Sequence, residues 1–403
     1  MTVTDRFLDY VKIDSQSSEK GGSTPSTAGQ FSIAERIAED LKKIGVADVV
    51  LDDKCYIYAN IPPTPGREKE PKVGLIAHMD TAPAFCGTNI KPRIIKHYDG
   101  GDIILNEKLN IVLRTAEFPG ITKYRGQSII VTDGTTLLGA DDKAGIAEIV
   151  SAIENIFKNN ISHPAITVAF TPDEEIGAGV DNFDVDRMRT DYTYTVDGGE
   201  LGELQYENFN AASATITVNG NCIHPGEGKN RMKNAILMAM EFNSMLPPAQ
   251  IPAHTEGREG FFHLTDIEGN EERTVMHYIV RDHSKEIFSE RKNMMLKITD
   301  YLNSKYGENT INAEIKDSYY NMYEKVKDHM EIVERAERAF EKNGIDVIDS
   351  PIRGGTDGAR LSFMGIVCPN LSAGGHNFHG KYEYIPIESM EAMVNVLVDI
   401  IQG

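Results

Sequence analysis

The chain has 403 residues, and at roughly 150 residues per domain this length favours two or three cores over one small binding module. Hydrophobic residues make up 40% and charged residues 25%, values typical of globular proteins, which excludes disordered, collagen-like and coiled-coil chains. Lysine and arginine number 41 against 61 acidic residues, and the net charge of −20 repels phosphate backbones and anionic membranes, so we expect neither nucleic acid nor a membrane as partner.

Residues 1–14 mix charged and apolar side chains, which predicts an amphipathic helix instead of a signal sequence. No apolar run approaches the roughly 18 residues of a membrane span. The cysteines lie far apart without a C-x-x-C pair, at Cys55, Cys86, Cys222 and Cys368. This spacing predicts neither a disulfide framework nor a zinc ribbon, so we expect buried, reduced thiols and a cytoplasmic location.

The first half of the chain alternates helices with short apolar strands. Apolar residues recur at helical spacing over 28–44, and Gly45 follows as a helix cap. The expected strands are 73–77, 166–170 and 193–196, and a long helix is expected over 144–158. This alternation predicts an α/β domain with a mostly parallel sheet flanked by helices.

After residue 199 the pattern changes to the βαββαβ order of a ferredoxin-like fold. The expected elements are strand 211–219, helix 231–246, strands 261–267 and 274–281, helix 285–306 and strand 310–316. The α/β pattern then resumes with helix 330–342, strand 365–371 and helix 388–400. We therefore expect an α/β domain formed by 1–208 and 320–403, with 209–319 inserted as a ferredoxin-like α+β lid domain.

Histidine and acidic residues follow the first three strands where each one ends. In chain order these segments are His78-Met79-Asp80, Asp173-Glu174-Glu175 and Asp197. Each alone is most simply an ordinary polar loop. Because ligands bind at the carboxyl ends of strands in open α/β sheets, however, we expect these side chains to converge.

Other candidates also have simpler explanations when taken singly. Asp141 and Asp142 open the helix 144–158, where a cap needs only one carboxylate. His224 in His-Pro-Gly is explained by a turn, and Arg281 by a surface ion pair. His376 and His379 lie in a glycine-rich stretch, where either a loop residue or a ligand fits.

The combination of histidine and acidic side chains among these candidates points to a divalent metal ion. Oxygen ligands with one or two imidazoles suit Zn²⁺ first, with Mn²⁺ or Co²⁺ as alternatives. Asp80, two residues after His78, is suited to orient that imidazole. Glu174 and Glu175 are adjacent, and a turn could aim one at a metal and the other at a water. The serine-hydrolase, P-loop and dinucleotide-binding motifs are absent.

Five motifs resemble, in the same order, those of the tripeptide aminopeptidases. These belong to the dinuclear-zinc metallopeptidase family that includes carboxypeptidase G and succinyl-diaminopimelate desuccinylase. The motifs are His78-Met79-Asp80-Thr81-Ala82-Pro83, the run of residues 132–145, Asp173-Glu174-Glu175-Ile176-Gly177, Val196-Asp197-Gly198-Gly199 and Phe378-His379-Gly380. The likeness covers nearly the whole chain, and its most specific part is the run that ends at Gly145.

The resemblance implies two zinc ions per chain, held by two groups that share one ligand. One group would be His78, Asp141 and Asp197, and the other Asp141, Glu175 and His379. Asp80 would orient His78, and Glu174 would be the general base. In the lid, His224 would reach the scissile carbonyl, while Arg281 and Arg353 match arginines that bind the substrate carboxylate.

The resemblance also implies the activity, that of an aminopeptidase releasing the N-terminal residue from short peptides, chiefly tripeptides. A homodimer is one assembly to expect, and a second subunit is one source of His224 for the site. A related metal-dependent deacylase or carboxypeptidase is the alternative among enzymes, and a non-catalytic metal- or peptide-binding protein is the alternative outside them. A protein without turnover need not keep the carboxylate of Glu174, so its presence favours catalysis.

Overall fold

The structure is a computed structural model that describes residues 1–403. Residue contacts divide the chain into two compact units. Unit 1 comprises Met1–Tyr206, Glu324–Ser350 and Thr356–Gly403, and unit 2 comprises Glu207–Tyr323 and Pro351–Gly355. The domain limits expected from the sequence, with 209–319 as the insert, stay a prediction. None of the helices has the length and apolar character needed to cross a membrane.

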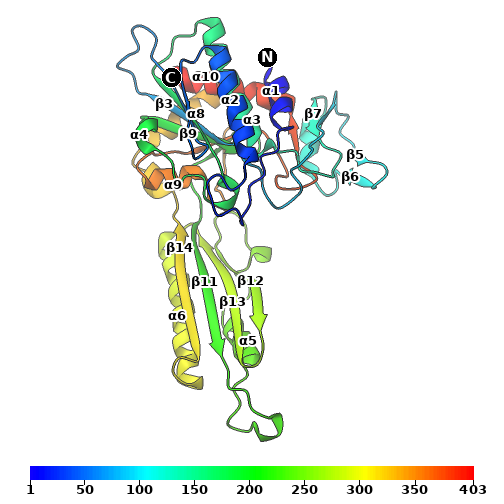
Figure 1. Cartoon of the computed structure of the whole chain (residues 1–403), viewed down its shortest axis with the longest axis vertical. Helices are drawn as coiled ribbons and strands as arrows, with labels where there is room; N and C mark the ends of the chain where they lie inside the picture. The colour runs from blue at the N-terminus through cyan, green and yellow to red at the C-terminus, as the bar shows by residue number, and fades with distance from the viewer. The chain divides into compact units, whose positions relative to one another are not determined.

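A sheet that includes β3 and β9 forms the centre of unit 1 (Figure 1). It has eight strands in the order β1-β2-β8-β3-β9-β16-β10-β15. Its strands in that order are Asp48–Leu51, Ile57–Ile61, Ile166–Thr171, Val73–His78, Tyr192–Gly198, Asn370–Ser372, Glu203–Gln205 and Ile348–Asp349. The middle strands β8, β3, β9 and β16 run parallel to one another. Antiparallel pairs involve β1, β2 and β10, so the predicted mostly parallel sheet is confirmed as a mixed sheet with a parallel centre.

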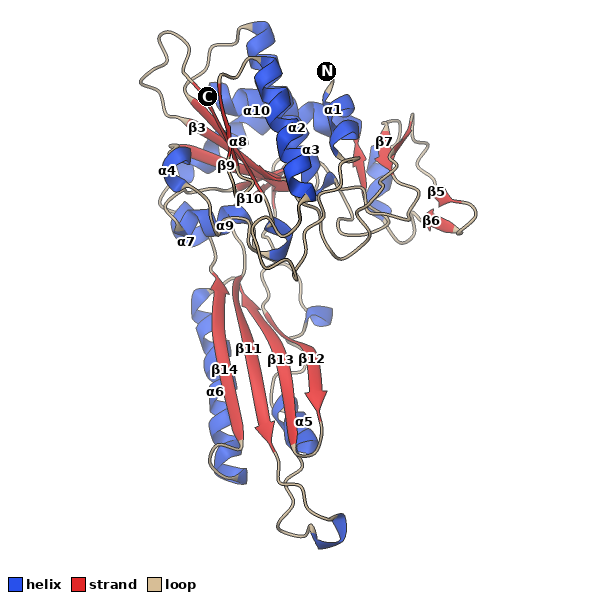
Figure 2. Ribbon diagram, in the orientation of Figure 1, coloured by secondary structure: helices blue, strands red, loops and turns tan.

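Helices flank this sheet on both faces (Figures 1 and 2). On one side lie α1 (Val3–Tyr10), α2 (Gly29–Ile44), α3 (Ala140–Asn159), α8 (Met330–Lys342) and α10 (Ile387–Gln402). On the other lie α4 (Val185–Met188) and α9 (Asp357–Phe363). Every residue of β3 and β8 is buried. Because these strands are buried on both faces, their sequences are nearly continuous apolar runs and do not alternate between apolar and polar residues.

Two small sheets in unit 1 were not expected from the sequence. One is β17-β7-β4, formed by Tyr384–Pro386, Ile129–Val131 and Arg93–Ile95, and the other is the hairpin of β5 (Ile103–Asn106) and β6 (Ile111–Leu113). Tyr98, Leu113 and Ile121 belong to the buried cluster beneath them. Strands of three or four residues are too short to show a period, and β17 joins β7 from far along the chain.

Unit 2 contains one antiparallel sheet, in the order β12-β13-β11-β14, with α5 and α6 against it (Figure 2). Its strands in chain order are β11 (Asn210–Asn219), β12 (Phe261–Gly269), β13 (Arg273–Asp282) and β14 (Ile311–Tyr319), and the helices are α5 (Ala235–Ser244) and α6 (Lys285–Tyr306). The βαββαβ order is therefore confirmed. Helix α5 begins four residues later than expected, because the Asn234 side chain accepts a hydrogen bond from Leu237 N at 3.2 Å and caps it there.

The remaining elements are short, namely α7 (Tyr323–Val326), η1 (Pro119–Tyr124), η2 (Glu174–Ile176), η3 (Pro225–Glu227) and η4 (Pro252–His254). The expected strand 365–371 is only partly right. Pairing begins at Asn370, while Ile366 and Cys368 pack into a buried cluster with Leu361.

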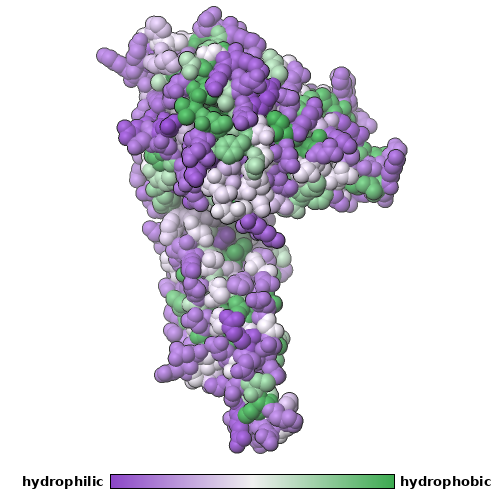
Figure 3. Space-filling view, viewed as in Figure 1, coloured by the Kyte–Doolittle hydropathy of each residue, from purple (hydrophilic) through white to green (hydrophobic).

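The cysteine prediction also needs correction. All four thiols are free, but only Cys55 and Cys368 are buried, whereas Cys86 and Cys222 are exposed in loops. Hydrophilic residues dominate the face shown in Figure 3.

Glu148 in α3 is fully buried, and neither of its carboxyl oxygens has a hydrogen-bond partner. Burial raises the pKa of Glu148 well above its ordinary value, so between the unfolded and the folded pKa the folded protein holds a proton that the unfolded chain releases. Above the unfolded pKa this difference makes folding less favourable as pH rises. We expect Glu148→Met to raise the free energy of unfolding at pH 7 by roughly 1–3 kcal/mol, measured by urea denaturation.

The gain should shrink as the pH falls toward 4, where the unfolded chain begins to hold the proton as well. Glu154 on the same helix is the matched control, because its carboxylate accepts a hydrogen bond from Arg6 and pairs with Lys158. Glu154→Met should destabilise the protein. A loss of stability in Glu148→Met as large as in Glu154→Met would contradict this account.

Candidate metal centre

The parallel centre of the sheet brings the predicted side chains together at one edge. His78 is the last residue of β3, which lies between β8 and β9. Strand β8 leads into the turn of Glu174 and Glu175, and β9 carries Asp197. Asp141 stands at the start of α3, which packs against β3 and β9. The expected convergence at the strand ends is therefore observed.

Two groups of ligand atoms result, and Asp141 belongs to both. His78 Nε2 lies 2.8 Å from Asp141 Oδ1 and 3.4 Å from Asp197 Oδ1. His379 Nε2 lies 3.0 Å from Asp141 Oδ2 and 2.9 Å from Glu175 Oε2. Within each group the ligand atoms all lie within 4.8 Å of one another. Asp141 thus offers one oxygen to each group, the arrangement that a bridging ligand needs.

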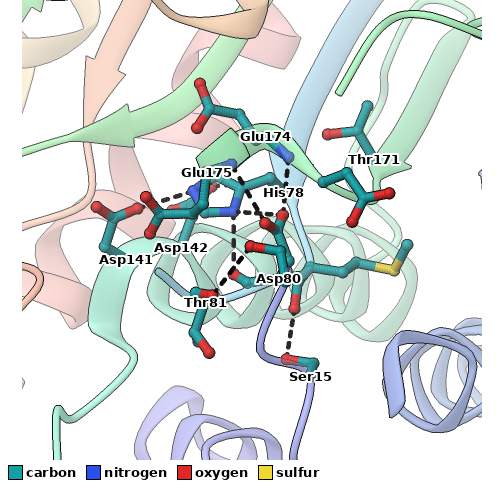
Figure 4. A network of polar contacts seen from close by, with 12 residues as sticks. Ser15, His78, Asp80, Thr81, Asp141, Asp142, Thr171, Glu174 and Glu175 are labelled. Atoms are coloured by element: carbon teal, nitrogen blue, oxygen red, sulfur yellow. Dashed lines mark hydrogen bonds and ion pairs between the residues drawn. The ribbon is translucent and has the colours of Figure 1, made fainter. Parts of the chain in front are cut away.

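Asp80 fixes both the imidazole of His78 and the glutamate turn (Figure 4). It is fully buried, and its Oδ1 lies 3.3 Å from His78 Nδ1. The two carboxylate oxygens accept hydrogen bonds from Glu174 N at 3.0 Å and from Glu175 N at 3.2 Å. One side chain therefore sets the orientation of a ligand on β3 and of two residues that follow β8.

Asp141 and Asp142 divide two tasks between them. Asp142 Oδ1 accepts a hydrogen bond from Gly145 N at 3.2 Å, and its Oδ2 accepts one from His78 N, also at 3.2 Å. This buried side chain therefore caps the helix and ties it to β3. The carboxylate of Asp141 is left for the ligand groups.

Burial shapes the electrostatics of the cluster. It raises the pKa of Asp197 to about 6 and that of Glu175 to about 7, and in both cases the charge of Asp141 adds to the effect. Hydrogen bonds to Asp141 and Glu175 raise the pKa of His379 to about 11. Burial, and then the charge of Asp197, raise the pKa of Glu174 well above its ordinary value.

These residues fit divalent metal ions. Buried acidic groups crowd together, and the Oε1 atom of Glu175 is buried without a hydrogen-bond partner. Carboxylate oxygens and imidazole nitrogens are the donors that Zn²⁺, Mn²⁺ and Co²⁺ accept. Cations bound among them would offset the cost of burying these charges.

A pocket of about 480 Å³ in unit 1 adjoins the second ligand group. Glu175 and His379 form part of its wall, and the rest comes from residues 16–20 and 82–84. Ser17, Ser18 and Glu19 contribute polar groups to the lining. With Lys20 also in the wall, the pocket places hydrogen-bond acceptors and one cation beside candidate metal ligands.

Other predicted residues lie elsewhere. His376 Nε2 is 2.7 Å from the hydroxyl of Tyr124, and its ring stacks on Tyr384, so His376 is a packed residue outside both ligand groups. His224 is exposed in unit 2, where its Nδ1 accepts a hydrogen bond from Gly226 N at 3.2 Å.

Both arginines also lie in unit 2 and donate to backbone carbonyls. Arg281 Nη1 donates to Ala212 O at 3.2 Å and to Val280 O at 3.1 Å. Arg353 Nη1 donates to the carbonyls of Gly257 and Glu259, at 2.7 and 3.1 Å. These contacts fix both side chains, and in Arg353 they occupy donors that a substrate carboxylate would use.

Two buried acidic residues near the cluster were missed by the sequence analysis. Asp357 accepts a hydrogen bond from Thr171 Oγ1 at 2.7 Å, and burial raises its pKa to about 7. Glu383 accepts hydrogen bonds from four consecutive backbone N–H groups that end at Asp141. Neither belongs to a motif that one sequence can reveal. Each is recognised only by contacts with residues more than 180 positions away.

The sheet and its paired ligand groups define a class of protein, an α/β protein with candidate sites for two neighbouring metal ions. Comparison with known proteins agrees. Residues 131–403 match the model of "Peptidase family M20/M25/M40". The chain is 55% identical to a peptidase T of Halothermothrix orenii over 401 residues, which is 99% of this chain and 98% of that protein. The chain therefore belongs to peptidase family M20/M25/M40 and is a peptide-bond hydrolase.

Two solved structures support the same fold. Aminopeptidase PepT from Bacillus cereus superposes with a TM-score of 0.79 at 24% identity, covering 99% of this chain and 97% of that one. The Bacillus subtilis YXEP protein, described as a dinuclear metal-binding peptidase of the M20 family, superposes with a TM-score of 0.63 at 14% identity, covering 99% and 96%. At these identities the likeness speaks for the fold alone.

Proposed function

We propose that this chain is a tripeptide aminopeptidase that works with two divalent metal ions, Zn²⁺ first and Mn²⁺ or Co²⁺ as alternatives. The observation that carries the proposal is the sharing of Asp141 between two ligand groups, with Glu174 in the adjoining turn. His78, Asp141 and Asp197 would hold one ion, and Asp141, Glu175 and His379 the other. The 55% sequence identity with a peptidase T, over 99% of this chain, supports the reaction class.

Bound ions supply Lewis-acid chemistry, polarising a carbonyl and making water more acidic. The remaining work falls to side chains. Glu174 would take a proton from the attacking water on a carboxylate oxygen and later return it to the leaving nitrogen. Asp80 would keep that carboxylate in place through its hydrogen bond to Glu174 N, and would hold His78 from the other side.

The pocket beside Glu175 and His379 is our proposed place for the first residue of the peptide. A free α-amine is a cation with three N–H donors, and Glu19, Ser17 and Ser18 offer oxygen acceptors in the pocket wall. Lys20 in the same wall carries a like charge, so the carboxylate of Glu19 is the proposed partner of the α-amine.

Residues of unit 2 complete the proposal. His224 would stabilise the charge that develops on the scissile carbonyl oxygen, and Arg281 would hold the peptide carboxylate. Arg353 stays a candidate for that carboxylate, although its contacts with Gly257 and Glu259 suit a loop-fixing role as well. The cytoplasm stays the proposed location and a homodimer the proposed assembly.

A comparison of three substrates tests the function. We expect a tripeptide to be hydrolysed at its first peptide bond, and its N-acetylated form to react at least roughly 10²-fold more slowly in kcat/KM, since the acyl group removes the α-ammonium charge. A matching dipeptide should be a poorer substrate, because its carboxylate lies closer to the scissile bond. Product analysis and metal content would be measured on the same sample.

The alternatives give opposite outcomes in this assay. Faster cleavage of the acetylated peptide would favour a deacylase, and release of the C-terminal residue would favour a carboxypeptidase. A metal-loaded protein that cleaves none of the three would favour a binding protein.

A further inference from the structure

Glu383 makes an unusual set of contacts at the start of α3. Its Oε2 accepts hydrogen bonds from Leu138 N at 2.6 Å and Gly139 N at 3.0 Å, and its Oε1 accepts them from Ala140 N at 2.7 Å and Asp141 N at 3.3 Å. The side chain is 2% exposed, so water does not compete for these donors. One buried carboxylate thus satisfies four consecutive backbone N–H groups, the last of which belongs to the ligand shared by both metal groups.

The local backbone explains how four N–H groups can meet one carboxylate. Gly139 has φ 77° and ψ 30°, the left-handed conformation that glycine adopts without strain. Successive N–H groups around such a residue form a concave donor site for an anion. Asp141 and Asp142 then depart from helical φ and ψ before α3 continues. The segment 138–141 therefore lacks helical hydrogen bonds of its own at these donors and depends on Glu383.

Glu383 lies in a short loop, residues 376–384, that also contacts the side chain of Asp141. His376 and Tyr384 exchange backbone hydrogen bonds of 2.9 and 3.1 Å, which close residues 376–384 into a loop. His379 lies within this loop and touches Asp141 Oδ2 at 3.0 Å, while Glu383 holds Asp141 N. The loop therefore contacts both the backbone N–H and the carboxylate of Asp141.

We propose that Glu383 is a positioning residue for the metal centre: it fixes the backbone of Asp141 so that the two carboxylate oxygens face the two ligand groups. The proposal rests on the metal-binding part of the proposed function. A carboxylate is required because all four partners are donors, and an amide would direct its own N–H groups at some of them. Glu383 does not touch substrate, and its effect passes through Asp141.

Three variants test the role. Glu383→Gln replaces one acceptor oxygen by a donor, and Glu383→Asp keeps the carboxyl group but shortens its reach. Glu388→Gln is the matched control, since Glu388 accepts a bifurcated hydrogen bond from Ser128 N, at 3.0 Å to each carboxyl oxygen, and belongs to neither ligand group. Amide hydrogen exchange of peptides covering 137–142 is measured on metal-free protein, and Zn²⁺ affinity is measured by competition with a chelating dye.

In Glu383→Gln we expect faster exchange over 137–142 and Zn²⁺ binding weaker by roughly 10–100-fold, as with other residues that orient metal ligands. Glu383→Asp should fall between that variant and the wild type, and Glu388→Gln should match the wild type in both measurements. Should Glu383→Gln prove too unstable to purify, Glu383→Asp carries the same comparison with a smaller effect.

Unchanged exchange would overturn the proposal, because the donors would then not depend on Glu383. Faster exchange with unchanged Zn²⁺ affinity would also overturn it, since Glu383 would then be only a structural residue. The wild-type protein tests the proposed function separately. A wild type that binds Zn²⁺ but does not hydrolyse tripeptides, or one that binds no Zn²⁺, would contradict that function.

Discussion

Replacing Glu174 with glutamine will remove most of the turnover and leave both metal-ligand groups in place. The amide keeps the shape of the side chain, and the backbone N–H of residue 174 can still donate to Asp80. What is lost is a carboxylate oxygen able to take a proton from water and return it to the leaving nitrogen. Removing such a group lowers kcat by roughly 10²–10⁴-fold, while KM should change little because binding contacts remain.

Glu175→Gln is the sharpest comparison, because it makes the same chemical change one residue away. Glu175 Oε2 lies 2.9 Å from His379 Nε2 and belongs to the second ligand group. This variant should lose bound metal, whereas Glu174→Gln should keep it. Steady-state kinetics and metal analysis of both proteins decide the matter. Wild-type kcat in metal-replete Glu174→Gln would place the general base elsewhere.

The convergence of the site could be predicted because it depends on a rule of the fold. His78, Glu174 and Asp197 each stand at or just after the end of a strand, and parallel neighbours end at the same edge of a sheet. The order of β8, β3 and β9 in the centre of the sheet satisfies that rule. Long apolar strands covered on both faces are also easy to recognise, which is why the expected bounds of β3, β8 and β9 came within two residues of the structure.

Contacts that depend on distant parts of the chain could not be predicted. Glu383 and Asp357 look like ordinary acidic residues in the sequence, and only the folded chain shows each accepting hydrogen bonds from buried donors. His376 and His379 posed a similar problem, since they share one glycine-rich stretch. The ring of His376 stacks on Tyr384, whereas His379 faces Asp141. Spacing and composition do not separate these two environments, and only the resemblance of Phe378-His379-Gly380 to a family motif singled out His379.

Removing the metal should abolish tripeptide hydrolysis completely and reversibly. Two ligand groups that share Asp141 predict about two divalent ions per chain, more than one structural tetrahedral site would hold. Treatment with a strong chelator should therefore lower tripeptide hydrolysis to background. Adding Zn²⁺, Mn²⁺ or Co²⁺ back should restore it, with metal content measured in parallel by atomic emission.

Asp141 and Asp142 provide the matched pair for this prediction, because they are neighbours with different tasks. Asp141→Asn weakens a ligand common to both groups, so bound metal should fall well below one ion per chain and activity should be lost. Asp142→Asn leaves the ligand set untouched but weakens the contacts with Gly145 N and His78 N, so thermal stability should fall more than metal content. A fully active enzyme with one tightly bound ion, or an Asp141→Asn variant that still binds two, would rule out a shared ligand. Equal loss of metal in the two variants would mean that helix capping, and not the bridging carboxylate, controls the site.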